Sequence, residues 1–368
     1  MAVVLLGGCT AVGADGGPAP TGGAGSPLPA GCGTGPLRLA GSPLQQAAVA
    51  EWLRGYRTAG PQAPAPDVVP GPGGAEAVLA GRVQLAASEL PAAGVDGDRV
   101  TPGCAGRRLV GLPVLAAPVT VVYSLPTVRP LTVTPAIVAR VYLGLVTEWS
   151  DPEIAAANPG VELPATRITP VRPATAPAGT EALTRFLAAR VPELWTAPPG
   201  PGWPAGATGS PEPDVAQAVR RTPGALGYVE GPVPPGGGVA VASVDLDPDV
   251  DLDPDPGPAA VPGSDAVAPT TAAVRSAVAA AEIEGRSPDV RVMVDPALDE
   301  PEAYPVVLIG YQLACAGAGA DQAQPVEAFL RYALGDSGQT AVERLGYAAL
   351  PAQLRGRARS AVESLSDG

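Results

Sequence analysis

The segment Val171–Leu187, with the sequence VRPATAPAGTEALTRFL, carries residue types that commonly hold an anion. Arg172 ends a strand-like run, and Gly179 and Thr180 stand at the start of a helical run. A guanidinium can donate two parallel hydrogen bonds to an oxyanion, and the free N–H groups of a helix N-terminus favour negative charge. The segment therefore predicts an oxyanion site at a strand–loop–helix unit.

The same residues also have a purely structural interpretation. A salt bridge from Arg172 to a loop carboxylate needs no ligand, and neither does an N-cap role for Thr180 with Glu181 in the first turn. Prolines and alanines fill the loop between them, where an anion site would be expected to carry hydroxyl groups. The segment alone leaves both interpretations open.

Composition excludes several classes of function. The chain has 368 residues, enough for two domains with their own cores, yet it contains no histidine, and all 23 basic residues are arginine. Without histidine the usual hydrolytic triads, imidazole acid–base catalysis and most zinc sites are missing, so we expect a protein that is not an enzyme and has no metal or other cofactor. The net charge of −13 and the scattered arginines argue against nucleic-acid binding.

The N-terminal sequence MAVVLLGGC resembles the end of a bacterial lipoprotein signal, with Cys9 as the lipidated residue. The run is short and lacks a basic start, so a start further upstream and a chance match are both open. Residues 10–35 are rich in Gly, Pro and Ala and predict a flexible tether, which suits a lipid-anchored protein on the outer face of the cell membrane. No apolar stretch is long enough to predict a transmembrane helix.

Strand-like and helical runs alternate along the chain, which predicts α/β architecture with parallel strands. A short strand is expected in 37–44, a helix in 45–59, a strand–turn–helix–strand unit in 66–91, and a pair of buried strands in 107–126. Helices are expected in 134–149, 180–191 and 270–283, with two more between 324 and 362. Strands are expected in 166–171, 225–231 and 304–315.

An acidic, Pro-rich segment interrupts this alternation, with an aspartate at every second position from Asp245 to Asp255 in the pattern VDLDPDVDLDPD. Spaced carboxylates can bind calcium, but the prolines and the missing Gly-turn-plus-Glu pattern favour a solvated loop. We therefore expect 231–268 to be an irregular insert.

Several segments, in order along the chain, resemble the extracytoplasmic phosphate-binding protein of the high-affinity phosphate ABC transporter. They are VYLGLVTEWSDPEIAAANPGVELPATRITPV, RTPGALGYVE, YPVVLIGYQLAC, LGYAALP and VQLAASELP. The resemblance runs from about residue 37 to 360. It implies a two-lobed, type II periplasmic-binding fold, with a mixed sheet and helices on both faces in each lobe. Lobe I would comprise 36–123 and 305–368, lobe II 124–304, and the chain would cross near 123–126 and 304–305.

The resemblance also implies a function and a set of partners. The protein would capture inorganic phosphate or a related oxyanion between its lobes and deliver it to the permease subunits of an ABC importer, as a monomer. Hinge closure on the ligand would accompany capture. The ligand-binding positions carried over from the family's four loops are Ser42, Leu44, Gly73, Gly74, Glu89, Arg172, Ala178, Gly179 and Thr180.

Three of the family's hydroxyl donors are missing in this sequence. Pro43, Gly71 and Ala178 stand where Thr or Ser is usual, and Glu89 replaces the usual aspartate as acceptor for a protonated phosphate oxygen. Each lost bond to a charged ligand costs roughly 1.5–3 kcal/mol unless backbone or water replaces it. A second hypothesis is therefore a degenerate family member, a cell-surface accessory lipoprotein that binds another small ligand or none.

Three cysteines remain besides Cys9, so at most one disulfide can form among them and one cysteine is left unpaired. Cys104 precedes the strand run at 109, and Cys315 ends the run 304–315. If these strands lie side by side and antiparallel, the two cysteines meet, and we expect that pairing. Cys32 with Cys104 is the alternative.

Overall fold

The computed structural model describes residues 37–59, 67–69, 74–93, 104, 106–234, 236–246, 266–285, 287–317 and 320–366. The predicted lipidation site Cys9, the tether 10–35, Cys32, the glycines Gly71 and Gly73, and most of the acidic segment (247–265) lie outside these residues.

A mixed, nine-stranded sheet forms the frame of the molecule, with the strand order β2-β1-β3-β14-β4-β8-β6-β7 and β9 paired to β4. Its strands are β1 (Arg38–Ala40), β2 (Asp67–Val69), β3 (Leu85–Ser88), β4 (Leu109–Tyr123), β6 (Thr169–Pro173), β7 (Ser210–Glu212), β8 (Ala225–Glu230), β9 (Ala240–Val241) and β14 (Val307–Cys315). A small sheet contains β5 (Thr132–Val133), β10 (Ser243–Asp245) and β11 (Ala266–Val267), and a hairpin contains β12 (Glu282–Glu284) and β13 (Arg291–Met293).

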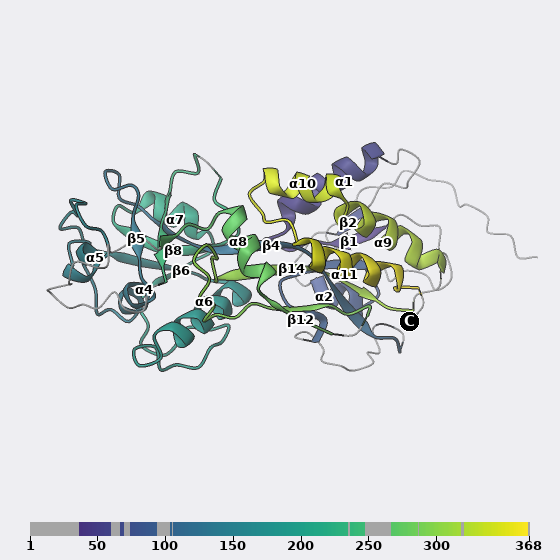
Figure 1. Ribbon diagram of the computed structural model, residues 1–368, viewed down its shortest axis with the longest axis horizontal. Coiled ribbons are helices and arrows are strands. Elements are labelled where there is room, and N and C mark those ends of the chain that lie inside the picture. The colour runs from purple at the N-terminus through teal and green to yellow at the C-terminus, as the bar shows by residue number, and fades with distance from the viewer. Residues whose placement is uncertain are drawn as a thin grey trace, which may run out of the picture.

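The helices cover this sheet in two groups, which give the elongated, two-lobed outline of Figure 1. Lobe I contains α1 (Gln46–Ala59), α2 (Gly74–Leu79), α9 (Ala320–Ala333), α10 (Asp336–Arg344) and α11 (Ala352–Glu363). Lobe II contains α4 (Pro135–Tyr142), α5 (Pro152–Ala156), α6 (Pro177–Arg190) and α7 (Val215–Arg221). The remaining helix, α8 (Thr271–Ala279), lies in the middle of the molecule near β4 and β14.

The strand β4 belongs to both lobes. Its first part, Leu109–Pro118, pairs with β14, and its last part, Val119–Tyr123, pairs with β8. The pairing partner thus changes at Pro118/Val119, before the crossover expected at 123–126. One continuous apolar core also extends through both lobes, since buried residues of β4 contact each side.

Residues 107–126 were expected to form a pair of strands, but the structure shows one strand of 15 residues that contains two prolines. Pro113 lies opposite Tyr311, beside a bulge at Gly310/Tyr311 that interrupts the regular register. Pro118 lies where the partner strand changes, and its carbonyl accepts from Gly231 N at 2.8 Å. Because proline lacks an N–H, it is tolerated in a strand where the ladder is already irregular.

The C-terminal helices and the insert also differ from the expectation. Residues 324–362 form parts of three helices rather than two, because Gly335 separates α9 from α10 and Pro351 immediately precedes α11. The segment 231–268, expected to be irregular, contributes β9, β10 and β11. Asp245, the first residue of the acidic run, is buried in β10 instead of lying in a solvated loop.

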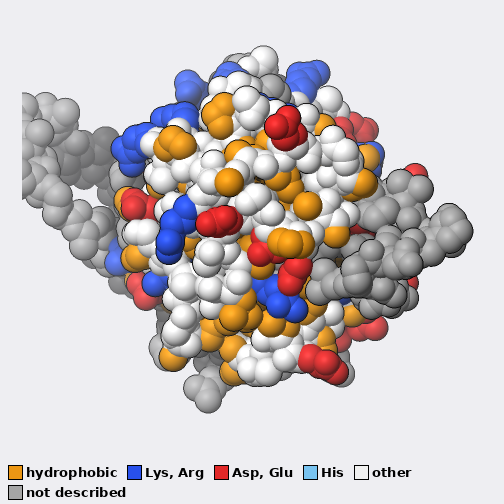
Figure 2. Space-filling model, turned by 90° about the vertical axis from the view of Figure 1, so that its left-hand side faces the viewer, with side chains coloured by type: hydrophobic (Ala, Val, Ile, Leu, Met, Phe, Trp, Pro, Cys, Tyr) orange, Lys and Arg blue, Asp and Glu red, His pale blue; other side chains and the backbone are white. Residues whose placement is uncertain are grey.

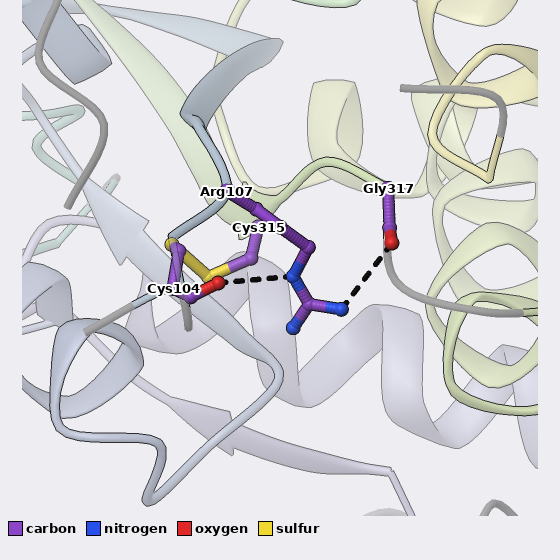
Figure 3. Close-up of a disulfide and its surroundings, with 4 residues drawn as sticks. All are labelled: Cys104, Arg107, Cys315 and Gly317. Atoms are coloured by element: carbon purple, nitrogen blue, oxygen red, sulfur yellow. Dashed lines mark hydrogen bonds between the residues drawn. A yellow bond between two sulfur atoms is a disulfide. The ribbon is translucent and has the colours of Figure 1, made fainter. Parts of the chain in front are cut away.

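The structure contains the Cys104–Cys315 disulfide, with a sequence separation of 211 residues. The antiparallel ladder that was expected brings the cysteines together, since Cys315 lies opposite Leu109. Arg107 reinforces the junction, as Figure 3 shows: its guanidinium donates to the carbonyl oxygens of Cys104 at 3.0 Å and Gly317 at 3.3 Å.

Candidate functional site

A cavity of about 270 Å³ lies where α6 of lobe II faces β3 and β14 of lobe I. Most of its lining is apolar, and its charged members are Glu89, Glu181 and Arg185, the last two of which form an ion pair within α6. The remaining lining residues are Leu90, Pro91, Ala178, Ala182, Val292, Met293, Val294, Pro296, Pro305, Val307, Leu308, Ile309 and Tyr311. The cavity therefore joins two of the predicted ligand positions, Glu89 and Ala178, from opposite lobes.

The loop before α1 supplies the lobe I side of the site. Ser42 Oγ donates to Glu89 Oε1 at 2.5 Å and accepts from Gln45 N at 3.1 Å. Gln45 is fully buried, and its amide nitrogen donates to the carbonyl oxygens of Ser88 and Tyr311, which anchors the loop on β3 and β14. The sequence-predicted residues Ser42 and Glu89 are thus in direct contact.

Leu44 lies in the same loop and reaches lobe II. A Cβ placed on Gly231, next to the end of β8, would be 3.0 Å from Leu44 Cδ1, so the two lobes are in van der Waals contact here. The carbonyl oxygen of Leu44 accepts from Tyr347 Oη at 2.6 Å. Gly74, also expected at the site, is the first residue of α2, while its neighbour Gly73 lies outside the described residues.

The N-terminus of α6 supplies the lobe II side. The helix begins at Pro177 with Ala176 as its N-cap residue, so Thr180 is not the helix cap that its position before Glu181 suggested. Thr180 is only 3% exposed, and its Oγ1 lies 2.7 Å from Tyr228 Oη. The proline at the first helical position starts the helix early, because its fixed φ suits that position and its missing N–H is not needed there.

The backbone amide of Gly179 is occupied by a side chain that sequence reasoning did not predict. Gly179 N donates to Glu230 Oε1 at 2.6 Å, and Glu230 is the last residue of β8. Glu230 is the last residue of the motif RTPGALGYVE, which the sequence analysis noted. Nothing in the spacing of that motif shows that β8 contacts α6. The site therefore contains two carboxylates, Glu89 from lobe I and Glu230 from lobe II.

Burial shifts both carboxylates toward their neutral forms. Burial raises the pKa of Glu89 above its ordinary value, opposed by hydrogen bonds from Ser42 and Gln45. Burial also raises the pKa of Glu230, opposed by the bond from Gly179 and increased further by the charge of Glu89. The charge of Glu89 thus makes Glu230 harder to ionise, as expected for like charges near one another.

Arg172 projects from β6 beside a cluster of aromatic rings. Its Nε donates to Gly209 O at 3.1 Å, and its charge acts on the pKa of Tyr142 and of Tyr228. It forms no salt bridge with any carboxylate in the described part of the chain, so the ion-pair interpretation of this arginine is not what the structure shows. Burial raises the pKa of Tyr228 to about 12, which keeps its hydroxyl neutral beside Thr180 and the indole of Trp203.

Glu89→Gln should stabilise the protein at neutral pH in the absence of any oxyanion. Because burial raises the folded-state pKa of Glu89, its contribution to stability is present below the unfolded pKa and is lost as the pH rises through the folded value. The free energy of unfolding, measured by thermal unfolding between about pH 4.5 and 8, should therefore fall less steeply with pH for the variant than for wild type. Each tenfold difference between the folded and unfolded protonation constants corresponds to about 1.4 kcal/mol.

The exposed Glu363→Gln at the end of α11 is the control for removing one charge from lobe I. We expect it to leave the wild-type pH dependence unchanged. Identical slopes for wild type and Glu89→Gln would contradict the burial argument.

Residues 26–337 match the family described as PBP superfamily domain. The chain belongs to the PBP superfamily. The two-lobed, type II fold with a mixed sheet, which the resemblance implied, is confirmed for this superfamily member.

Two curated relatives resemble this PBP superfamily member over different lengths. Phosphate-binding protein PstS 3 of Mycobacterium tuberculosis (strain ATCC 25618 / H37Rv) is 27% identical over 260 residues, which cover 69% of this chain and 66% of the relative, slightly less than two thirds of its length. Phosphate-binding protein PstS 2 of the same strain is 25% identical over 342 residues, covering 90% of this chain and 87% of the relative.

Solved structures resemble the fold. The phosphate binding protein from Stenotrophomonas maltophilia superimposes with a TM-score of 0.57 at 16% identity, covering 89% of this chain and 93% of that one. At this identity the likeness concerns the PBP fold alone. Within the described residues, none of the helices combines the length and apolar character that a bilayer crossing requires.

Proposed function

We propose that this PBP superfamily member is an extracytoplasmic solute-binding protein that captures inorganic phosphate between its lobes for an ABC importer. The observation that carries the proposal is the cavity that Glu89 of lobe I and the first turn of α6 in lobe II line together, with Ser42 bonded to Glu89 and Gly179 to Glu230. The names of the two mycobacterial relatives support phosphate as the ligand. The protein acts by binding, without catalysis.

Each predicted residue has a role in this proposal. Arg172 supplies positive charge, and the amides of Leu44, Gly73, Gly74, Ala178 and Gly179 supply neutral donors, together with the hydroxyls of Ser42 and Thr180. Glu89 accepts the proton of a protonated phosphate oxygen, because a carboxylate is the natural acceptor for that group. Backbone donors thereby compensate in part for the hydroxyl groups missing at Pro43, Gly71 and Ala178.

We also propose that the protein is anchored outside the cell membrane and works with permease subunits. Lipidation at Cys9 and the tether 10–35 would hold the protein on the outer face of the cell membrane, where a monomer delivers its ligand to the permease subunits. The end face of lobe II shows arginines and carboxylates interspersed among apolar and neutral side chains, without one large basic patch (Figure 2). That mixed face gives no support to nucleic acid as a partner.

Calorimetry on the full chain tests the ligand directly. Titration with inorganic phosphate should give a saturable heat, and sulfate, which carries no proton at neutral pH for Glu89 to accept, should bind more weakly. No heat and no thermal stabilisation at millimolar phosphate would contradict the proposal and favour the degenerate alternative.

Arg172→Ala should weaken phosphate binding by roughly ten- to a hundredfold, since a hydrogen bond to a charged group contributes roughly 1.5–3 kcal/mol. Arg172 is the natural candidate because no described carboxylate neutralises it. The measurement is the phosphate dissociation constant at fixed pH and ionic strength.

The matched control is Arg221→Ala, which removes an equal charge from an exposed position at the end of α7 in the same lobe. We expect it to change the dissociation constant little at physiological salt, because salt screens the charge of an exposed side chain. Equal losses in the two variants would show that Arg172 acts only through net charge.

A further inference from the structure

The chain places one of its own carboxylates on the amide that would hold a ligand. Glu230 Oε1 accepts from Gly179 N at 2.6 Å, in the first turn of α6. The contact depends on glycine, because a Cβ at position 179 would lie 2.6 Å from both Cγ and Oε1 of Glu230. An oxyanion that reaches this amide therefore meets a negative group already there.

Among the residues that the structure describes, no positive charge pairs with this carboxylate. In the described part of the chain, neither Glu230 nor Glu89 takes part in a salt bridge. The charged or titratable groups around them are Tyr228 on the same strand, Arg172 on β6, whose charge acts on Tyr228, and Tyr347, which lies near Glu89. On α6, Glu181 and Arg185 pair with each other.

Two ionised carboxylates in one partly buried site would repel a dianion. Like charges in such a site destabilise one another, and a third negative group is admitted only if one of them becomes neutral. Burial and the charge of Glu89 already favour the neutral form of Glu230. A neutral carboxylic acid also carries one O–H donor, whereas the ionised form can only accept.

We propose that Glu230 is a specificity-determining residue, which takes up one proton from solvent when an oxyanion binds and changes from a competitor for the Gly179 amide into a hydrogen-bond donor to the ligand. The inference rests on the proposed phosphate function and adds to it. Its O–H takes the place of the hydroxyl that is missing at Ala178. The cleft consequently selects oxyanions that arrive with a single negative charge, such as dihydrogen phosphate or dihydrogen arsenate, over dianions such as sulfate.

Two substitutions separate the donor role from simple repulsion. Glu230→Gln keeps the size of the side chain, removes the charge and supplies a permanent N–H donor, whereas Glu230→Ala removes the charge and supplies no donor. The exposed Glu193→Gln, in the loop after α6, removes an equal charge from lobe II. Thermal unfolding first establishes that each variant of the full chain is folded.

The experiment is calorimetric titration with inorganic phosphate at pH 5.5, 7 and 8, in pairs of buffers with different ionisation enthalpies, so that the protons taken up on binding are counted. Comparing proteins at the same pH cancels the titration of phosphate itself. At pH 8, Glu230→Gln should bind roughly ten- to a hundredfold more tightly than wild type, as expected for one hydrogen bond to a charged ligand gained without a proton. It should also take up fewer protons than wild type, and Glu230→Ala should bind less tightly than Glu230→Gln.

Several results would overturn the inference. They are an affinity and proton uptake of Glu230→Gln equal to those of wild type, an equal tightening in Glu230→Ala, and an equal tightening in Glu193→Gln. If wild type binds phosphate and Glu230→Gln behaves identically, the phosphate function stands and the role of Glu230 falls. If no protein binds at any pH, both fall. Binding at pH 8 by Glu230→Gln alone would support the role of Glu230 and show that wild type does not capture phosphate at that pH.

Discussion

A Cys104→Ala/Cys315→Ala variant should lose roughly 2–5 kcal/mol of unfolding free energy, the usual range for a native disulfide. The bond closes a long loop, with a sequence separation of 211 residues, and loop-closure models assign larger effects to longer loops. The folded state should change little, because the β4–β14 ladder and the two hydrogen bonds of Arg107 still join the same segments (Figure 3). The effect should therefore arise chiefly in the unfolded state.

Urea unfolding of the variant, compared with wild type in the presence and absence of reductant, measures this loss. Reduced wild type should approach the variant, and the variant itself should not respond to reductant through this bond. A wild-type midpoint that is unaffected by complete reduction would contradict the prediction.

Trp52→Ala should cost roughly 3–5 kcal/mol of unfolding free energy, the range for removing a large buried aromatic side chain. Trp52 is 0% exposed in α1, and its Nε1 donates to the carbonyl oxygen of Gly338 in α10 at 2.9 Å. Gly338 must itself be small, since a Cβ there would lie 2.3 Å from Tyr332 O. The variant would leave a cavity between α1 and α10 and remove the bond that ties them.

Trp52→Phe is the matched control, because it retains most of the apolar volume and loses only the indole N–H and one ring. It should destabilise the protein clearly less than Trp52→Ala in urea unfolding. Since the loop with Ser42 and Leu44 leads directly into α1, the alanine variant should also bind phosphate more weakly. A loss below about 1 kcal/mol for Trp52→Ala would show that the site collapses around the missing ring.

Local patterns were sufficient to predict several elements of this fold. The helix expected in 45–59 is α1, and the helix expected from residue 134 begins there as α4, where Ile137 N donates to Thr134 Oγ1. The disulfide could be predicted because each cysteine stands at one end of a recognisably apolar strand run. These features depend on residues close in sequence or on one simple pairing.

The continuous strand β4 could not be predicted in the same way. Pro113 and Pro118 normally argue against a central strand, and only the bulge and the change of partner make them acceptable. The internal partners of the site were missed for a similar reason. The bonds of Glu230 to Gly179 and of Tyr228 to Thr180 join residues about fifty positions apart, and no sequence pattern fixes the register of β8 against α6.

The shared strand β4 has a mechanical consequence. In a molecule whose lobes are joined only by flexible loops, the lobes can rotate relative to one another without deforming a strand. Here a hydrogen-bonded strand passes through both lobes, held on one side by Val119 N to Val306 O and on the other by Gly231 N to Pro118 O. A change in the angle between the lobes must therefore bend or twist this strand where its pairing partner changes, at Pro118/Val119.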